Sequence, residues 1–132
     1  MTVDHVGLAV AHLEAMAEWY AEVLDAAVDY RVERRGIAMR AIVLIDADGF
    51  RLELLHREGS AAAHGRETVA ESLLRHGLGH LALRVDDVQT EFARLLGLGA
   101  AAVMQPGPGS QPGMVIAFVA DPEENLVELV SR

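Results

Sequence analysis

Hydrophobic and polar residues alternate along two short segments, each containing a histidine at or near its start. The first is 5–10, with the sequence His-Val-Gly-Leu-Ala-Val, and the second is 79–85, in which His80 takes the place of His5. Alternation with a period of two predicts half-buried strands. After each strand, apolar residues recur every three or four positions, over 13–24 and 87–97, which predicts two amphipathic helices.

Further apolar runs follow each helix and predict more strands. They lie at 31–45 and 50–55 in the first half, with a turn at 46–49, and near 100–104, at 114–120 and at 125–130 in the second half, with a turn at 121–122. Segment 105–113 holds three prolines and three glycines, and we expect no regular element there but a surface connection or a lid. The sequence therefore predicts an α+β fold of two tandem βαβββ modules.

The two halves are joined by a segment with a weaker pattern. Residues 67–76 predict a short helix that ends at Gly77, with Val69, Leu73 and Leu74 on its apolar side. We expect one domain, 1–132, that consists of a first module at 1–56, a linker at 57–78 and a second module at 79–132.

A constant offset in residue number relates the two halves. The pairs that it matches are His5 and His80, Asp46 and Asp121, and Glu53 and Glu128. The histidine and the glutamate therefore have the same separation in both halves, and each glutamate lies in a short apolar frame. We interpret these matches, which need no gap, as a tandem duplication.

The duplicated histidines and glutamates predict a metal site. The neighbours of His5 on its strand face are small, which leaves open space in front of the imidazole. Glu53 and Glu128 lie inside apolar strands, where a carboxylate is costly unless it is paired or bound to metal. Two imidazoles and two carboxylates can share one divalent cation, and this donor set suits Ni, Co, Zn, Mn or Fe.

Composition narrows the remaining chemistry. The chain has no cysteine and its 11 basic residues are all arginines, which excludes disulfides, cysteine zinc sites and Schiff-base chemistry. A net charge of -9 argues against nucleic acid as a partner, and no apolar run is long enough to span a membrane. The N-terminus does not resemble a signal peptide, so we expect a soluble cytoplasmic protein with a small-molecule substrate. The histidines without a duplicated counterpart are interpreted as surface or loop residues: His12, His56, His64 and His76.

The residues around the predicted ligands resemble the vicinal oxygen chelate superfamily, which includes glyoxalase I, methylmalonyl-CoA epimerase, extradiol dioxygenases, and fosfomycin and bleomycin resistance proteins. The similar segments are 5–10 with Trp19, Tyr20 and Leu24, then 79–87, and 116–122 through 127–129. The resemblance implies that the two modules form a cupped mixed sheet around one metal ion. It also implies a homodimer and the metal ligands His5, Glu53, His80 and Glu128, a set similar to that of bacterial glyoxalase I.

The resemblance further implies a metal-dependent lyase or isomerase that transfers a proton next to a carbonyl through a metal-bound enediolate. Glu128, alternating with Glu53, would act as the general base. Arg84 lies on the strand face of His80 and would contact an anionic group of the substrate, with further candidates at Arg34, Arg35 and Arg40.

Several members of the superfamily compete for the assignment. Segment 114–130 resembles glyoxalase I, which converts a hemithioacetal to a thioester, whereas 53–56 and the linker helix resemble methylmalonyl-CoA epimerase. The additional catalytic glutamate of the epimerase has no clean match, and Glu33 is the nearest residue. The alternatives from other classes are a non-catalytic binding protein like the bleomycin resistance proteins and an Fe(II) extradiol dioxygenase.

Overall fold

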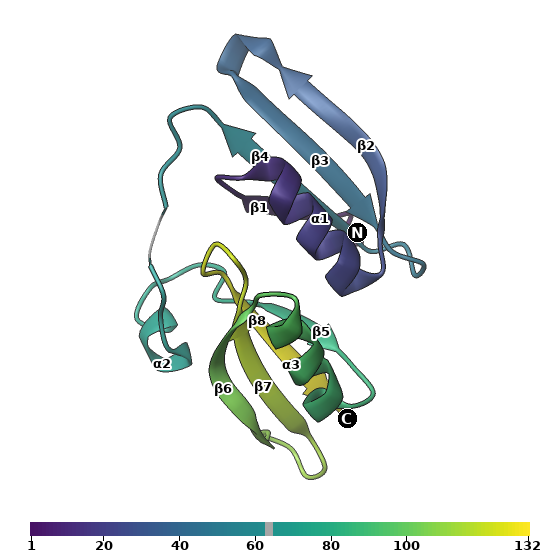
Figure 1. Cartoon of the computed structure of the whole chain (residues 1–132), viewed down its shortest axis with the longest axis vertical. Coiled ribbons are helices and arrows are strands. Elements are labelled where there is room, and N and C mark those ends of the chain that lie inside the picture. The colour runs from purple at the N-terminus through teal and green to yellow at the C-terminus, as the bar shows by residue number, and fades with distance from the viewer. Residues whose placement is uncertain (63–64) are drawn as a thin grey trace. The chain divides into compact units, whose positions relative to one another are not determined.

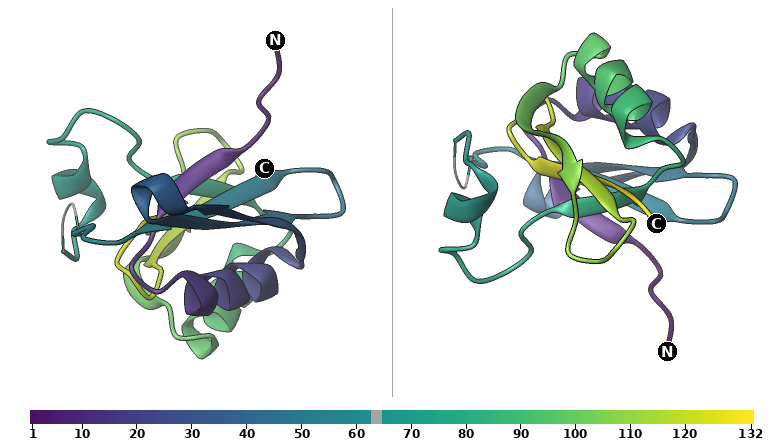
Figure 2. Two further views of the ribbon diagram at one scale, coloured as in Figure 1. Left: turned by 90° about the horizontal axis from the view of Figure 1, so that it is seen from above. Right: turned by 90° about the horizontal axis from the view of Figure 1, so that it is seen from below.

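The chain folds into two compact units with the same architecture. The structure, a computed structural model, describes residues 1–62 and 65–132, and the units are Met1–Ala62 and Ala63–Arg132 (Figure 1). Each unit has one four-stranded mixed sheet and one long helix that lies along a single face of that sheet (Figure 2). No helix in the described part of the chain is long and apolar enough to cross a membrane.

The first unit is a βαβββ module. Its elements are β1 (Val6–Ala9), α1 (Leu13–Leu24), β2 (Ala27–Arg34), the short 3₁₀ helix η1 (Arg35–Ile37), β3 (Met39–Ile45) and β4 (Arg51–Arg57). The strand order is β1-β4-β3-β2, in which β1 runs parallel to β4 and the other pairs are antiparallel. The helix predicted at 13–24 is confirmed, and β2 begins before the predicted strand, at Ala27.

The second unit repeats this topology after the linker. Its elements are α2 (Val69–Ser72), β5 (Leu81–Arg84), α3 (Val88–Gly97), β6 (Ala101–Pro108), β7 (Val115–Ala120) and β8 (Leu126–Ser131). The strand order is β5-β8-β7-β6, and β5 runs parallel to β8. The α+β fold with two βαβββ modules is therefore confirmed, while the cupped arrangement of the modules stays a prediction.

The core of each unit lies between its helix and one face of its sheet. Met16 and Tyr20 of α1 are almost fully buried, as are Leu52 and Leu54 of β4. Each such side chain contributes roughly 1.5–3 kcal/mol when it is withdrawn from water. Glu53 lies between the two leucines in the sequence, so its side chain points to the opposite face of the sheet. Because the core occupies the face of the sheet that carries the helix, the opposite face is left for polar side chains such as Glu53.

The duplicated aspartates shape the turns between the last two strands of each unit. Asp46 Oδ1 accepts hydrogen bonds from the backbone N–H groups of Asp48 and Phe50, at 2.9 and 2.8 Å. Asp121 Oδ1 accepts the matching bonds from Glu123 and Asn125, at 2.8 and 2.9 Å. The match between Asp46 and Asp121 in the two halves therefore reflects a structural requirement of the turn.

Two expectations about the irregular segments are wrong. The helix predicted at 67–76 is only the single turn α2, and Leu73 and Leu74 are exposed, because the helix lacks an apolar partner that would extend it. Strand β6 continues through Pro106 to Pro108, so the first part of segment 105–113 is regular. Proline is tolerated there because β6 is an edge strand whose pairing with β7 shifts register.

Candidate metal centre

His5 and Glu53 form a pair on the sheet face that does not carry α1. Glu53 of β4 lies beside Gly7 of β1, and His5 precedes Gly7 by two residues, so the two side chains share a face. His5 Nε2 lies 3.3 Å from Glu53 Oε2. A Cβ atom on Gly7 would lie 3.7 Å from the same carboxylate oxygen and 3.3 Å from Leu55 Cδ1. The 3.7 Å separation is an ordinary van der Waals contact, so the space beside the glutamate accepts a small residue, as Ala82 does at the equivalent position of the second unit.

His80 and Glu128 form the equivalent pair in the second unit. Glu128 of β8 lies beside Ala82 of β5, and His80 precedes Ala82 by two residues. His80 Nε2 lies 3.2 Å from Glu128 Oε2. The side chains of the two histidines are 40% and 32% exposed, and those of the two glutamates 21% and 18% exposed. The structure therefore places each predicted histidine against its predicted glutamate, in the same way in both units.

The donor atoms of each pair fit a shared divalent metal ion. Nitrogen and oxygen ligands that bind one ion at about 2.0–2.2 Å, with an angle of about 90–110°, lie roughly 3.0–3.5 Å apart. Both Nε2 to Oε2 distances fall in this range. No group of three or more His, Cys, Asp or Glu side chains suited to one ion occurs among residues 1–62 and 65–132.

The two histidine rings differ in the group that contacts them besides the glutamate. Asp4 Oδ2 lies 2.9 Å from His5 Nδ1, and this hydrogen bond raises the pKa of His5 and lowers that of Asp4. The His80 ring instead meets Phe118 edge to face, with ring centroids 5.2 Å apart. The match between the two halves did not select Asp4 and Phe118, because neither residue repeats, although an acidic residue directly before a predicted ligand histidine was itself a usable signal.

Three further residues singled out in the sequence, Arg84, Arg40 and His56, do not all lie on the sheet face that carries the His–Glu pair of their unit. Arg84 lies beside Val130 and shares the face of His80 and Ala82. In the first unit, Arg40 and His56 are cross-strand neighbours on the face opposite Glu53, and His56 Nδ1 lies 3.1 Å from the Val10 carbonyl oxygen. His56 therefore leaves the face of the His5 pair, as its position in the strand predicts.

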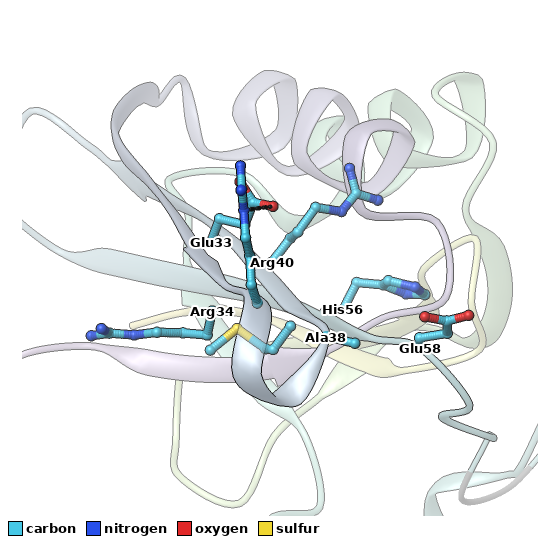
Figure 3. A pocket seen from close by; sticks show the side chains of 8 residues that line it. Glu33, Arg34, Ala38, Arg40, His56 and Glu58 are labelled. Atoms are coloured by element: carbon cyan, nitrogen blue, oxygen red, sulfur yellow. Dashed lines mark hydrogen bonds and ion pairs between the residues drawn. The ribbon is translucent and has the colours of Figure 1, made fainter.

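A cavity of about 280 Å³ lies at the end of the β2–β3 hairpin (Figure 3), and neither His5 nor Glu53 is among the residues that line it. Its lining includes Glu33, Arg34, Arg40 and His56. Glu33 is the cross-strand neighbour of Arg40 and pairs with Arg35 Nε at 3.3 Å. Glu33 thus projects from the face opposite Glu53, where it is badly placed to act together with Glu53 on one substrate. His12 and His76 are exposed, and His64 lies outside the described residues.

A protein-family model described as the Glyoxalase/Bleomycin resistance protein/Dioxygenase superfamily matches residues 2–129. The chain belongs to this superfamily. Among curated members, a probable lactoylglutathione lyase of Synechocystis sp. is 39% identical over 43% of this chain and 44% of that protein. A probable lactoylglutathione lyase of Vibrio cholerae is 26% identical over 97% of this chain and 88% of that protein. The match thus spans under half of the Synechocystis protein and most of the Vibrio protein.

Solved structures of superfamily members share this fold. A glyoxalase family protein from Enterococcus faecalis has a TM-score of 0.80 at 21% identity, with 98% of this chain and 96% of that chain covered. Glyoxalase I from Zea mays has a TM-score of 0.76 at 23% identity, and the match covers 98% of this chain but 44% of that chain. The maize chain is therefore more than twice as long as the region that this chain matches.

Proposed function

We propose that this superfamily member is a metal-dependent, glyoxalase I-like lyase that converts a hemithioacetal to a thioester. His5, Glu53, His80 and Glu128 would be the ligands of one divalent ion. The observation that carries the proposal is the repeated His–Glu pair, with Nε2 to Oε2 distances of 3.3 and 3.2 Å in the two compact units. The names of the curated relatives support the reaction class.

The chemistry assigned to the residues follows from their donors and exposure. A divalent ion at this site supplies Lewis-acid stabilisation of negative charge on the substrate oxygens. Glu128 removes the proton from the carbon next to the carbonyl and delivers it to the neighbouring carbon, with Glu53 as the alternate base. Both glutamate side chains are about four-fifths shielded from water, which favours proton transfer over loss of the proton to solvent.

Arg84 is the proposed contact for an anionic group of the substrate. It follows Ala82 by two residues on β5, on the face that carries His80 and Glu128. A guanidinium is the only cationic side chain that this chain offers besides protonated histidine, because it has no lysine. We expect Arg84→Ala to raise KM for an anionic thiol adduct about ten-fold or more with little change in kcat, measured by steady-state kinetics.

Substrate and metal are tested together by a turnover comparison. The purified protein is loaded separately with Ni²⁺, Co²⁺, Zn²⁺, Mn²⁺ or Fe²⁺ and assayed with a hemithioacetal and with methylmalonyl-CoA. We expect metal-dependent turnover of the hemithioacetal, and a loss of about 100-fold or more in Glu128→Gln. Glu18→Gln, an exposed glutamate of α1, removes the same charge and should leave turnover unchanged.

Each other outcome of this comparison contradicts the proposal in a defined way. Racemisation of methylmalonyl-CoA without turnover of the hemithioacetal would assign an epimerase, although Glu33 projects from the face opposite Glu53. Absence of turnover with every metal, combined with tight binding of a small molecule by chelated protein, would assign a non-catalytic binding protein.

A further inference from the structure

We infer that Asp4 is a positioning residue that fixes the ring of His5 for metal binding, an inference that rests on the proposed metal site. Asp4 Oδ2 lies 2.9 Å from His5 Nδ1, while His5 Nε2 lies 3.3 Å from Glu53 Oε2 on the other side of the ring. The two ring nitrogens thus have separate partners, one a hydrogen-bond acceptor and the other a fellow ligand.

This arrangement selects one tautomer of the imidazole. A carboxylate has no proton to donate, so a hydrogen bond to either ring nitrogen requires a proton on that nitrogen, and the neutral ring has only one to give. The contact of Nδ1 with Asp4, at 2.9 Å, is shorter than that of Nε2 with Glu53, at 3.3 Å, which favours the proton on Nδ1 and leaves the lone pair on Nε2. A histidine can bind a metal ion only through an unprotonated nitrogen, and a carboxylate on the far nitrogen both orients the ring and makes it a better donor. Asp4 therefore holds His5 in the form that the metal needs.

The described part of the second unit holds no counterpart of Asp4. The offset that matches His5 with His80 places Gly79 where the first unit has Asp4, and Phe118 where it has Val43. The His80 ring packs edge to face against Phe118, a contact that restrains the ring plane but selects no tautomer. His5 and His80 occupy equivalent positions in the two halves, but different neighbouring groups contact their rings.

The inference is tested first by removing the carboxylate. Asp4→Ala and Asp4→Asn are compared with Asp86→Ala, which removes an exposed aspartate from the second unit. Nitrogen-15 NMR of the metal-free protein at a pH where His5 is neutral reports its tautomer, and competition titration with Zn²⁺ and Ni²⁺ reports affinity. In Asp4→Ala we expect a shift of His5 away from the Nδ1–H form and about a ten-fold or greater loss of affinity. Asp4→Asn keeps a hydrogen-bond acceptor and should retain part of the Nδ1–H tautomer and part of the metal affinity. Asp86→Ala should match the wild type in both.

The second part of the test introduces a carboxylate at the equivalent position of the second unit, directly before His80. A side chain at Gly79 would have no atom within 4 Å of its Cβ, and the backbone there is not left-handed, so Gly79→Asp fits without strain. We expect this substitution to move His80 toward the Nδ1–H tautomer and to increase the affinity for Zn²⁺ several-fold.

The outcomes separate the inference from the proposed function. An unchanged His5 tautomer and unchanged affinity in Asp4→Ala would overturn the inference, while the metal site itself would stand. A wild-type protein that binds neither ion would refute the proposed function. The tautomer measured in metal-free Asp4→Ala would still decide whether Asp4 positions the ring.

Discussion

Small residues lie beside the proposed ligand glutamates in both units. Gly7 and Ala82 occupy the same place in the two units, each next to the glutamate of its own sheet. The sequence predicted open space on this face from residue size alone, and both residues are exposed in the structure. The orientation of the imidazoles did not follow from the duplication, because it depends on contacts such as that of Asp4, which do not repeat.

Enlarging Gly7 tests this requirement for space. The Cβ of Gly7→Ala would touch Leu55 Cδ1 at 3.3 Å, a flexible group that can yield, so we expect near-normal metal affinity. Gly7→Val adds two methyl groups beside Glu53 Oε2 and should reduce the affinity about ten-fold or more by displacing the carboxylate. Competition titration measures both, and circular dichroism checks that both variants fold. Equal affinity in Gly7→Val and the wild type would contradict the expected crowding.

At the level of elements, a helix predicted from the apolar pattern is present where its apolar residues pack against a sheet. The helix at 13–24 matches α1 from first to last residue because its periodic residues are buried against the sheet. The helix at 67–76 has a similar pattern and a capping box between Thr68 and Glu71, yet only Val69–Ser72 is helical. Local signals start a helix, but burial of its apolar face sustains it. No such burial is available to Leu73 and Leu74, which are exposed.

The turn aspartates give a prediction about stability. Asp121 is 2% exposed and accepts bonds from two backbone N–H groups and from Asn125 Nδ2. Asp121→Ala leaves buried donors unpaired and should lower the free energy of unfolding by about 2–4 kcal/mol. Asp46 makes the same backbone bonds in a less buried turn, so Asp46→Ala should cost less. Urea denaturation compares the two variants, and a larger loss for Asp46→Ala would contradict this ranking.

The Arg66–Glu124 pair gives a pH dependence. Arg66 forms two hydrogen bonds to Glu124, at 2.7 and 2.8 Å, and lowers the pKa of this carboxyl below its usual value. Because the folded-state pKa is depressed, the contribution to stability is present above the ordinary glutamate pKa and is lost as pH falls through the folded-state value. We expect Glu124→Gln to be less stable than the wild type at neutral pH, and the two unfolding curves to converge once the pH lies below the folded-state pKa. A difference in the free energy of unfolding that stays constant across this pH range would contradict a stabilising role for the Arg66–Glu124 pair.

The whole molecule consists of two units that each hold half of the proposed ligand set. The duplication, read from the constant offset between the halves, predicted both the repeated topology and the two His–Glu pairs. The sequence did not establish how the pairs come together, because a linker of this length permits pairing within one chain or between two chains.

Mixing two inactive variants distinguishes these assemblies. If the expected homodimer forms its sites across chains, a mixed dimer of His5→Ala and His80→Ala has one site with both defects and one intact site. We therefore expect co-refolded variants to recover up to one quarter of the wild-type hemithioacetal turnover, since half of the dimers are mixed and each has one working site. Turnover no higher than that of the separate variants would show that both units of a site come from the same chain.

The central claim is that two His–Glu pairs from different units share a single metal ion. Equilibrium dialysis followed by elemental analysis, at a free metal concentration just sufficient to saturate the wild type, measures this most directly. We predict one ion per chain in the wild type and well below one in both His5→Ala and His80→Ala, because either loss leaves three ligands. Two ions per chain, or full occupancy in either variant, would contradict a shared site.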